Sequence, residues 1–215
     1  MKISTHTIKV VSIIFLAVFM VACAVTAKPE TTPLGASPIP TSTGAAPLST
    51  EQQTNQAAIQ KTPLGAFTTN DTKGNEVTNE VFSNAKLTML NVWATFCGYC
   101  IQEMPELNEL SKEYADKGVQ IIGLVGDVGD DSGNVSNDEV QQVVNIYEKA
   151  GAEYLQLLPS SDLQSLILNY VSAFPTTIFI DSNGNILDYA IAGSRGNDYW
   201  KSVIDGYLNN EELAQ

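Results

Sequence analysis

The sequence predicts an α/β domain over residues 62–213, in which a mixed β-sheet has helices on both faces. Three observations lead to this fold class. Short apolar runs rich in β-branched residues alternate with stretches of helical pattern. Two of these runs flank Asp181-Ser182-Asn183-Gly184, a tight-turn sequence, and a last helical stretch follows that hairpin. A strand–helix–strand unit followed by a hairpin and a helix gives a mixed sheet with helices on both of its faces.

The first half of the domain contains one hairpin, two longer strands and a helix. The helix is indicated by apolar residues that recur at Ile101, Met104, Leu107 and Leu110. In chain order the predicted elements are an N-terminal hairpin of Phe67–Thr69 and Glu76–Thr78 around Asp71–Asn75, a strand at Lys86–Ala94, the helix at Gly98–Tyr114 and a buried strand at Val119–Val125.

The second half starts with a helix whose ends carry clear signals. Asp138 and Glu139 lie in its first turn, and Gly151 follows its last turn. The predicted elements are this helix at Asn137–Ala150, a short strand at Leu155–Leu158, a short helix at Ser161–Tyr170, strands at Thr176–Ile180 and Ile186–Ile191, and a closing helix at Asn197–Leu208.

The N-terminus is predicted to be a signal peptide, residues 1–22. Lys2 and Lys9 precede the apolar run Val10–Ala22, and Cys23 follows it. Met20-Val21-Ala22-Cys23 resembles the bacterial lipoprotein box, although Leu is usual where Met20 stands, and this resemblance implies lipidation of Cys23. An uncleaved signal anchor is an alternative, because apolar character continues to Ala27, and an incidental buried cysteine is another. Each interpretation places the remaining chain outside the cytoplasm.

Residues 23–61 are predicted to be the lipidated N-terminus and a disordered tether. The segment after Lys28 is rich in Thr, Pro, Ser, Ala, Gly and Gln and has no apolar period. Such a composition cannot bury enough surface to offset its chain entropy. We therefore expect a flexible connection between a membrane and the folded domain.

The charge of the chain excludes one class of partner. All 24 acidic residues follow Cys23, and the net charge is −13. An acidic surface repels nucleic acid and is not attracted to anionic lipid. We therefore expect no nucleic-acid partner and no electrostatic contact with a membrane surface.

Cys97 and Cys100 are the candidate catalytic residues, in Trp93-Ala94-Thr95-Phe96-Cys97-Gly98-Tyr99-Cys100. A structural zinc site needs four ligands, and the only histidine, His6, lies in the signal segment, so no metal is predicted. A bridge that closes over two residues adds little stability, although a structural disulfide stays possible. Thiol–disulfide exchange fits best, because a helix N-terminus stabilises the thiolate that acts as nucleophile.

This motif resembles the thioredoxin superfamily, and more narrowly the membrane-anchored extracytoplasmic thiol–disulfide oxidoreductases of the TlpA/ResA type. The likeness covers roughly residues 63–210 and includes Glu103-Met104-Pro105 and Phe174-Pro175-Thr176-Thr177. It implies a thioredoxin-like fold, no cofactor, Cys97 as nucleophile and Cys100 as resolving thiol. It also implies a cis bond at Pro175, facing the cysteine pair beside an open backbone edge for substrate.

The chain departs from the thioredoxin pattern at several positions. Thioredoxin keeps a buried Asp where Asn91 stands, and Asn91 cannot titrate. Glu103 resembles the Glu that supplies this carboxylate in the ResA-like branch, although a solvated helix acid is an alternative. Phe96 stands where Trp is usual, and Gly98-Tyr99 brings no cation. We therefore expect a moderately lowered pKa for the Cys97 thiol, which argues against a very strong oxidant.

The predicted function is reduction of disulfides in exported proteins by a monomer attached to the cell membrane on its extracytoplasmic side. The resemblance implies a membrane electron donor of the CcdA/DsbD type. A thiol oxidase and a non-catalytic thioredoxin-like binding lipoprotein are alternatives. A peroxidase is disfavoured, because peroxiredoxins have Thr where Ala94 stands. The acidic loop Gly126–Asp138 does not match a calcium-loop pattern and is interpreted as a solvated insertion beside the active site.

Overall fold

A six-stranded mixed sheet forms the centre of the computed structural model, which describes residues 58–130, 132–210 and 213. Its strand order is β1-β8-β7-β4-β5-β6. The strands are β1 Lys61–Pro63, β4 Leu87–Trp93, β5 Val119–Val125, β6 Leu155–Leu157, β7 Thr176–Asp181 and β8 Asn185–Ala192. β4, β5 and β6 run parallel, whereas β7 is antiparallel to β4 and β8, and β1 is antiparallel to β8. The thioredoxin-like fold class with a mixed sheet is confirmed.

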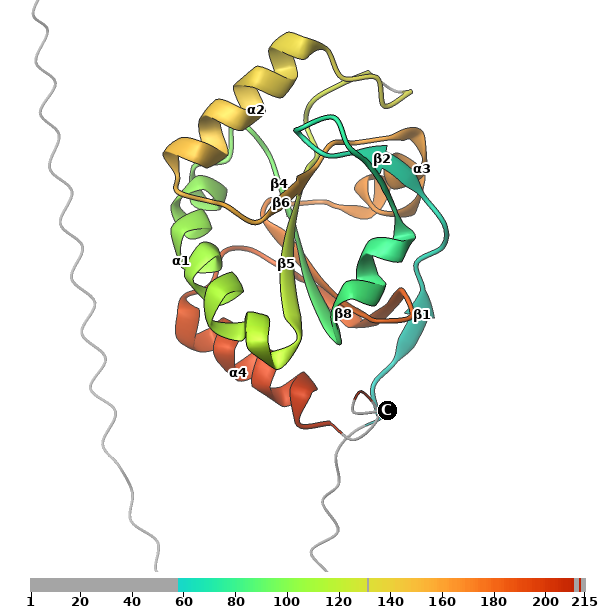
Figure 1. Cartoon of the computed structure of the whole chain (residues 1–215), viewed down its shortest axis with the longest axis vertical. Helices are drawn as coiled ribbons and strands as arrows, with labels where there is room; N and C mark the ends of the chain where they lie inside the picture. The colour runs from blue at the N-terminus through green and yellow to red at the C-terminus, as the bar shows by residue number, and fades with distance from the viewer. Residues whose placement is uncertain (1–57, 131, 211–212, 214–215) are drawn as a thin grey trace, which may run out of the picture. The chain divides into compact units, whose positions relative to one another are not determined.

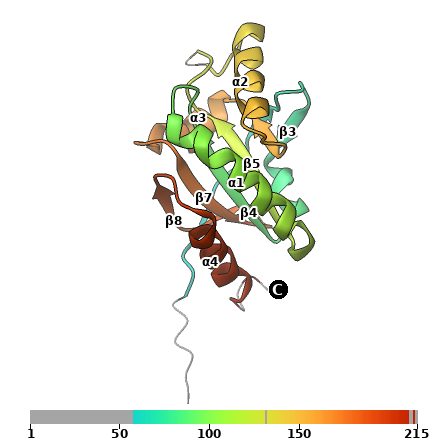
Figure 2. The ribbon, with the colours of Figure 1, turned by 90° about the vertical axis from the view of Figure 1, so that its left-hand side faces the viewer.

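Helices cover both faces of this sheet (Figure 1). On one face lie α1 Gly98–Tyr114, α2 Asn137–Lys149 and α4 Asn197–Leu208, packed on a cluster that includes Met89 and Phe179. Figure 2 looks onto this face, where α1 crosses in front of the strands and α4 lies beside it. The other face carries α3 Ser161–Leu166, the 3₁₀ helix η1 Asn79–Asn84 and the hairpin of β2 Thr68–Asn70 and β3 Glu76–Thr78.

The sheet has an apolar cluster on each of its two faces, because successive side chains along a strand point to opposite faces. β4 is buried on both sides, with Met89 in the cluster under α1 and Leu90 in the opposite cluster. A strand that is covered twice needs a nearly continuous apolar sequence, which Leu87–Trp93 supplies except at Thr88 and Asn91. This double burial fixes β4 at the centre of the molecule, and the motif with Cys97 starts where β4 ends.

Most predicted elements are confirmed, and the strongest patterns gave the closest bounds. α1, β5 and α4 begin and end at the predicted residues. The predicted helix Ser161–Tyr170 is interrupted, because α3 ends at Leu166 and a 3₁₀ turn, η3 Leu168–Tyr170, follows it. Ile167 and Leu168, at the junction of the two segments, are both buried in the cluster on this face of the sheet. A further 3₁₀ turn, η2 Ala115–Lys117, follows α1.

The N-terminal end of the domain and β8 differ from expectation. β1 begins at Lys61, inside the segment predicted to be tether, and Gln60 N–H donates to Asp188. β1 was not predicted because its three residues are exposed and include Pro63. β8 contains a bulge: Thr177 pairs with Ile191 but Phe179 pairs with Leu187, and Asp188 has a φ of 53°.

A five-residue pattern, Asp-x-x-Gly-Asn, forms three turns of one design. In each turn an oxygen of the Asp side chain accepts the backbone N–H groups two and four residues later, and the Asn side chain donates to the same carboxylate. The glycine has a positive φ in each case, which other residues adopt only with strain. The three copies are Asp71–Asn75, Asp130–Asn134 and Asp181–Asn185.

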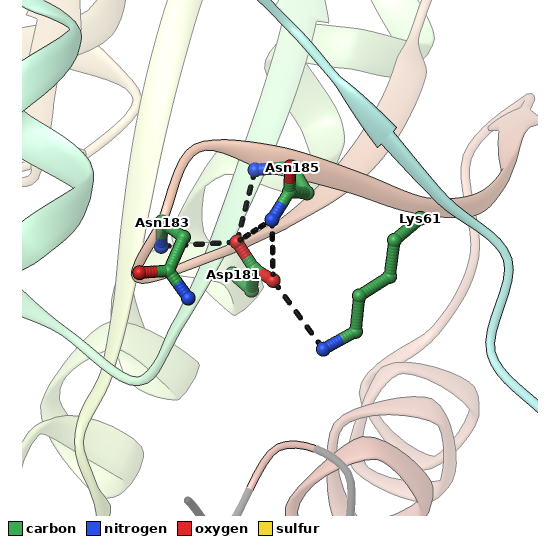
Figure 3. A network of polar contacts seen from close by, with 4 residues as sticks. All are labelled: Lys61, Asp181, Asn183 and Asn185. Carbon is green, nitrogen blue, oxygen red and sulfur yellow. Dashed lines mark hydrogen bonds and ion pairs between the residues drawn. The ribbon is translucent and has the colours of Figure 1, made fainter.

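The Asp181 turn joins β7 to β8, and the Asp181 side chain is buried beneath it; Figure 3 shows its contacts with Asn183, Asn185 and Lys61. Its carboxylate also lies 3.6 Å from Lys61 Nζ, so β1 is held to the hairpin by charge as well as by pairing. Burial raises the pKa of Asp181, but hydrogen bonds from Asn185 and Asn183 together with the charge of Lys61 outweigh it and hold the pKa below its ordinary value.

The predicted signal peptide, the lipidation site Cys23 and most of the predicted tether lie outside the described residues. Within the part of the chain that the structure describes, no helix is long and apolar enough to span a bilayer.

Candidate active site

Cys97 and Cys100 form a disulfide at the start of α1. Cys97 is the N-cap residue of the helix, and its Sγ accepts a hydrogen bond from the Cys100 N–H at 3.2 Å. Cys100 lies one turn into the helix and is 1% exposed, whereas Cys97 is 8% exposed. The N-terminus of α1, the positive end of the helix dipole, therefore lies at Cys97, which is the more accessible of the two cysteines.

The approach to Cys97 is fixed by a carboxylate from the neighbouring strand. Asp127 follows β5 and accepts hydrogen bonds from both donors of Thr95: the backbone nitrogen lies 2.8 Å from Oδ1 and 3.0 Å from Oδ2, and the hydroxyl oxygen lies 2.6 Å from Oδ2. Cys97 N–H in turn donates to Ala94 O. The sequence does not indicate this role for Asp127, because its partner, Thr95, is 32 residues away along the chain. It belongs to the acidic loop predicted to lie beside the active site.

Pro175 lies in a cis peptide bond with Phe174 at the start of β7. The register that pairs Val92 with Thr176 places this bond beside the end of β4, from which the cysteine motif continues. The Phe174 ring meets the exposed Phe96 ring edge-on, with centroids 6.1 Å apart. Gly126 makes room for Phe174, because a Cβ at Gly126 would lie 3.1 Å from that ring.

Glu103 is buried, with 3% of its surface exposed, so the alternative of a solvated helix acid is wrong. Its Oε1 accepts two hydrogen bonds, from Arg195 N–H and from the Trp200 indole N–H, each at 2.9 Å. Burial raises the pKa of Glu103, and these two hydrogen bonds only partly offset the effect. A carboxyl group with a raised pKa, one turn beyond Cys100 on the same helix, is suited to exchange protons with a thiol.

Glu103 and Glu106 together hold the start of α4. The N-cap of α4 is Gly196, which has no side chain to accept a hydrogen bond. Glu106 Oε2 instead accepts the Asn197 N–H at 3.0 Å, and Glu103 accepts the N–H of Arg195 just before the helix. Carboxylates at a helix N-terminus are favourable because the helix dipole is positive there. The acid of the candidate site is therefore also a structural contact between α1 and α4.

Asn91 occupies the position where thioredoxin has a buried Asp. It is 1% exposed and donates its side-chain N–H to Thr177 Oγ1 on β7. Asn91 carries no charge, and the buried carboxylate near the cysteine pair is that of Glu103, on α1 itself. Among residues 58–130, 132–210 and 213, no group of three or more His, Cys, Asp or Glu side chains is placed to bind a metal ion.

The geometry can be compared with known proteins. The profile of a family described as Redoxin matches residues 54–205. The chain belongs to the redoxin family. This redoxin is 33% identical over 120 residues to the thiol-disulfide oxidoreductase ResA of Bacillus anthracis, covering 55% of this chain and 60% of the relative. It is 31% identical over 128 residues to the thiol:disulfide interchange protein DsbE of Haemophilus influenzae, covering 59% and 62% of the two chains.

Solved structures of low sequence identity share the fold. A thioredoxin-family thiol:disulfide interchange protein from Chlorobium tepidum TLS aligns with a TM-score of 0.57 and 22% identity, over 71% of this redoxin and 100% of that chain. The expected thioredoxin-like fold and the membership of the TlpA/ResA-type group are thus confirmed. This redoxin spans about 60% of the length of the ResA relative that it matches.

Proposed function

We propose that this redoxin is an extracytoplasmic thiol–disulfide oxidoreductase that reduces disulfides in exported proteins. The observation that supports this proposal is the Cys97–Cys100 disulfide at the N-terminus of α1, with Glu103 buried one turn further along the helix and a cis bond at Pro175 just before β7, the strand that pairs with β4. The names of the relatives, a thiol-disulfide oxidoreductase and a thiol:disulfide interchange protein, support the same chemistry.

The residues have distinct roles in one cycle. The Cys97 thiolate attacks a substrate disulfide, forms a mixed disulfide and releases the first substrate thiolate, which takes a proton from water. Glu103 then accepts the proton of the Cys100 thiol, and the Cys100 thiolate attacks Cys97 Sγ. This step closes the Cys97–Cys100 disulfide, releases the second substrate thiolate and leaves the substrate reduced by two electrons.

The assignment as a reductase rests on the surroundings of the cysteines. Cys97 has the helix N-terminus behind it, but Gly98 and Tyr99 bring no cation between the two thiols. A strong thiol oxidant has a greatly stabilised reduced form and a reduction potential of about −120 mV, whereas the reduction potential of thioredoxin is about −270 mV. The motif supports a value closer to thioredoxin.

The proposed cellular setting follows from the N-terminal sequence. Lipidation of Cys23 and a tether of residues 23–61 attach a monomeric domain to the outer side of the cell membrane. A dithiol in that compartment becomes oxidised unless electrons are supplied to it. A membrane electron donor of the CcdA/DsbD type, which the TlpA/ResA resemblance implies, meets this need.

An insulin reduction assay tests the activity. The full chain, purified in detergent, is expected to accelerate the reduction of insulin by dithiothreitol, and Cys97→Ala is expected to abolish the acceleration. Wild-type protein that leaves the rate unchanged identifies a binding protein with a structural disulfide. A measured potential above about −180 mV, the value for protein disulfide isomerase, would favour the oxidase.

A further inference from the structure

The residues between β4 and α1 form a tight turn that presents the nucleophile. The Cys97 N–H donates to Ala94 O at 3.0 Å, which closes a turn with Thr95 and Phe96 at its two central positions. Cys97 is the N-cap of α1 at the end of this turn. The orientation of the turn therefore sets the direction in which Cys97 Sγ meets a substrate. It also sets the place of the Phe96 side chain, which is 75% exposed.

One carboxylate holds the middle of this turn. The Thr95 N–H and the Thr95 hydroxyl both donate to Asp127, with donor–acceptor distances of 2.8, 3.0 and 2.6 Å. Hydrogen bonds to a charged acceptor are stronger than those between neutral groups. Asp127 is itself held in place, because the N–H of the preceding residue, Gly126, donates to Trp93 O at 2.8 Å and prolongs the pairing of β5 with β4.

Neither folding stability nor thiolate formation accounts for a carboxylate at this position. Asp127 is exposed, so water could replace it as the acceptor for Thr95 at little cost in stability. A negative charge bound to a residue two positions before Cys97 also disfavours the thiolate that must form there. A gain in reaction geometry does account for it, because a nucleophile held in a fixed orientation has a lower barrier to attack.

Gly126 and Asp127 also connect this turn to the segment that carries the cis bond. A Cβ at Gly126 would lie 3.1 Å from the Phe174 ring, so that ring approaches the Gly126 backbone closely. Phe174 precedes the cis bond at Pro175, and its ring meets the Phe96 ring edge-on, with centroids 6.1 Å apart. The start of the acidic loop therefore contacts both the turn that presents Cys97 and the segment before β7.

We propose that Asp127 is a positioning residue for attack on disulfides in polypeptides: its hydrogen bonds to Thr95 hold the turn so that Cys97 Sγ and the Phe96 ring meet the substrate together. The inference rests on the proposed function. In the step concerned, the Cys97 thiolate forms a bond to one sulfur of the substrate disulfide, and the S–S bond of the substrate breaks. The departing thiolate takes a proton from water.

The proposal distinguishes large substrates from small reagents. The attacking sulfur must approach along the axis of the S–S bond that breaks, and a polypeptide that contacts Phe96 has little freedom to adjust its own position. Alignment of the turn therefore matters for a polypeptide. A small alkylating reagent makes no such contact and can reach the Cys97 thiolate from several directions, so its rate should depend little on Asp127.

The test compares these two kinds of reagent on the full chain, purified in detergent. The parent protein carries Cys100→Ala, so that the reaction stops at the mixed disulfide on Cys97. Initial rates of adduct formation with insulin and of alkylation by iodoacetamide are measured by mass spectrometry up to about pH 9.5, above the ordinary thiol pKa of about 8.5, so that Cys97 is a thiolate in every variant.

Asp127→Ala should change the two rates unequally. On the alkaline plateau, the rate with insulin is expected to fall roughly five- to twentyfold, because the orientation of the attacking sulfur is lost. The rate with iodoacetamide is expected to change by less than about twofold, because the thiolate itself is unaltered. A change in thiolate reactivity alone would alter both rates together.

Asp130→Ala is the matched control for charge. It removes one negative charge from the same acidic loop, and its carboxylate accepts hydrogen bonds from Ser132 and Asn134 of its own turn. Both rates are expected to equal those of the parent protein. A fall in the insulin rate as large as that of Asp127→Ala would mean that the charge of the loop, and not its contact with Thr95, acts on the substrate, and would overturn the proposal.

Thr95→Val gives a second and milder test. It removes the hydroxyl bond of 2.6 Å and keeps the backbone N–H that also donates to Asp127. The insulin rate is expected to fall roughly two- to fivefold, and the double variant with Asp127→Ala should be no slower than Asp127→Ala alone, because both changes remove one interaction. If Asp127→Ala does not fold, an insulin rate of Thr95→Val equal to that of the parent overturns the proposal.

Two further outcomes contradict the role of Asp127. One is an insulin rate that Asp127→Ala leaves unchanged, and the other is a parallel fall of the insulin and iodoacetamide rates. The proposed function fails in a different way: the parent protein then forms no adduct with insulin, although iodoacetamide still labels Cys97, and the positioning role fails with it.

Discussion

Cys97 and Cys100 differ in their surroundings although they are three residues apart. Cys97 caps α1 and is the more exposed sulfur, and Cys100 lies under the first turn. In the reduced protein we expect iodoacetamide at neutral pH to label Cys97 first, because the helix terminus stabilises its thiolate and reagent can reach it. Mass spectrometry of the tryptic peptides measures the order of labelling. Faster labelling of Cys100 would reverse the assigned roles.

Glu103 should make the stability of the protein depend on pH. Burial raises the pKa of Glu103 in the folded protein above its ordinary value of about 4.3. At a pH between these two values, the native state binds more protons than the unfolded state. Stability from this group therefore falls as pH rises through that window. Glu103→Gln has no such loss, and its side-chain oxygen can still accept from Arg195 and Trp200.

The prediction for Glu103→Gln is therefore a trend across pH. Relative to wild type, the variant should gain stability as pH rises from the ordinary Glu value of about 4.3 to the folded pKa of Glu103 and should gain no more above it, as urea unfolding at several pH values would measure. A difference between the two proteins that is constant over this range would show that the Glu103 pKa is unchanged on folding.

The sequence indicated only part of this site. Cys97 and Cys100 follow from their spacing at a strand–helix junction, and Glu103 and Pro175 from the resemblance. Trp200 carried no signal, because it meets Glu103 only through the fold, and a buried Trp usually indicates ordinary core packing.

At the level of elements, the Asp-x-x-Gly-Asn turns allow a controlled comparison. Asp181 is buried and satisfies N–H groups of Asn183 and Asn185 between β7 and β8, whereas Asp130 makes the same bonds in an exposed loop. Asp181→Ala should cost about 2–4 kcal/mol of folding free energy, because partly buried N–H groups lose their acceptor and the buried site of the carboxylate is left empty. Asp130→Ala should change little, because water replaces the carboxylate.

Thermal unfolding of the two variants decides this point. Equal losses of Tm would mean that the turn geometry itself, and not its burial, determines the contribution. The lowered pKa of Asp181 adds a pH dependence: its contribution is present above the ordinary Asp value of about 3.9 and is lost as pH falls below it.

The elements also show where a sequence pattern is sufficient. α1 and α4 were predicted to the residue because the apolar spacing along each helix agrees with the tertiary fold. β1 and the bulge at Asp188 were not, since both depend on pairing between distant strands. The strand order also depends on pairing between distant strands. β4 lies between β5 and β7, with both of its edges paired and both of its faces covered.

At the scale of the whole molecule, the proposal is a reductase that is kept reduced from a membrane. In living cells we expect most of the protein to be in the dithiol form, and removal of the membrane donor should shift it to the disulfide. Acid quenching, alkylation with a mass tag and blotting measure both states. A pool that stays fully oxidised in the presence of the donor would contradict the proposed direction while leaving the exchange chemistry intact.

The central claim is that Cys97 exchanges disulfides with exported proteins, and a trapping experiment tests it most directly. Cys100→Ala leaves the attacked partner bound to Cys97, because no second thiol can release it. Purification of the full-chain variant from its native host, followed by non-reducing gels and mass spectrometry, should yield mixed disulfides that dithiothreitol releases and that Cys97→Ala does not form. The absence of such adducts, or the same adducts with Cys97→Ala, would contradict the claim.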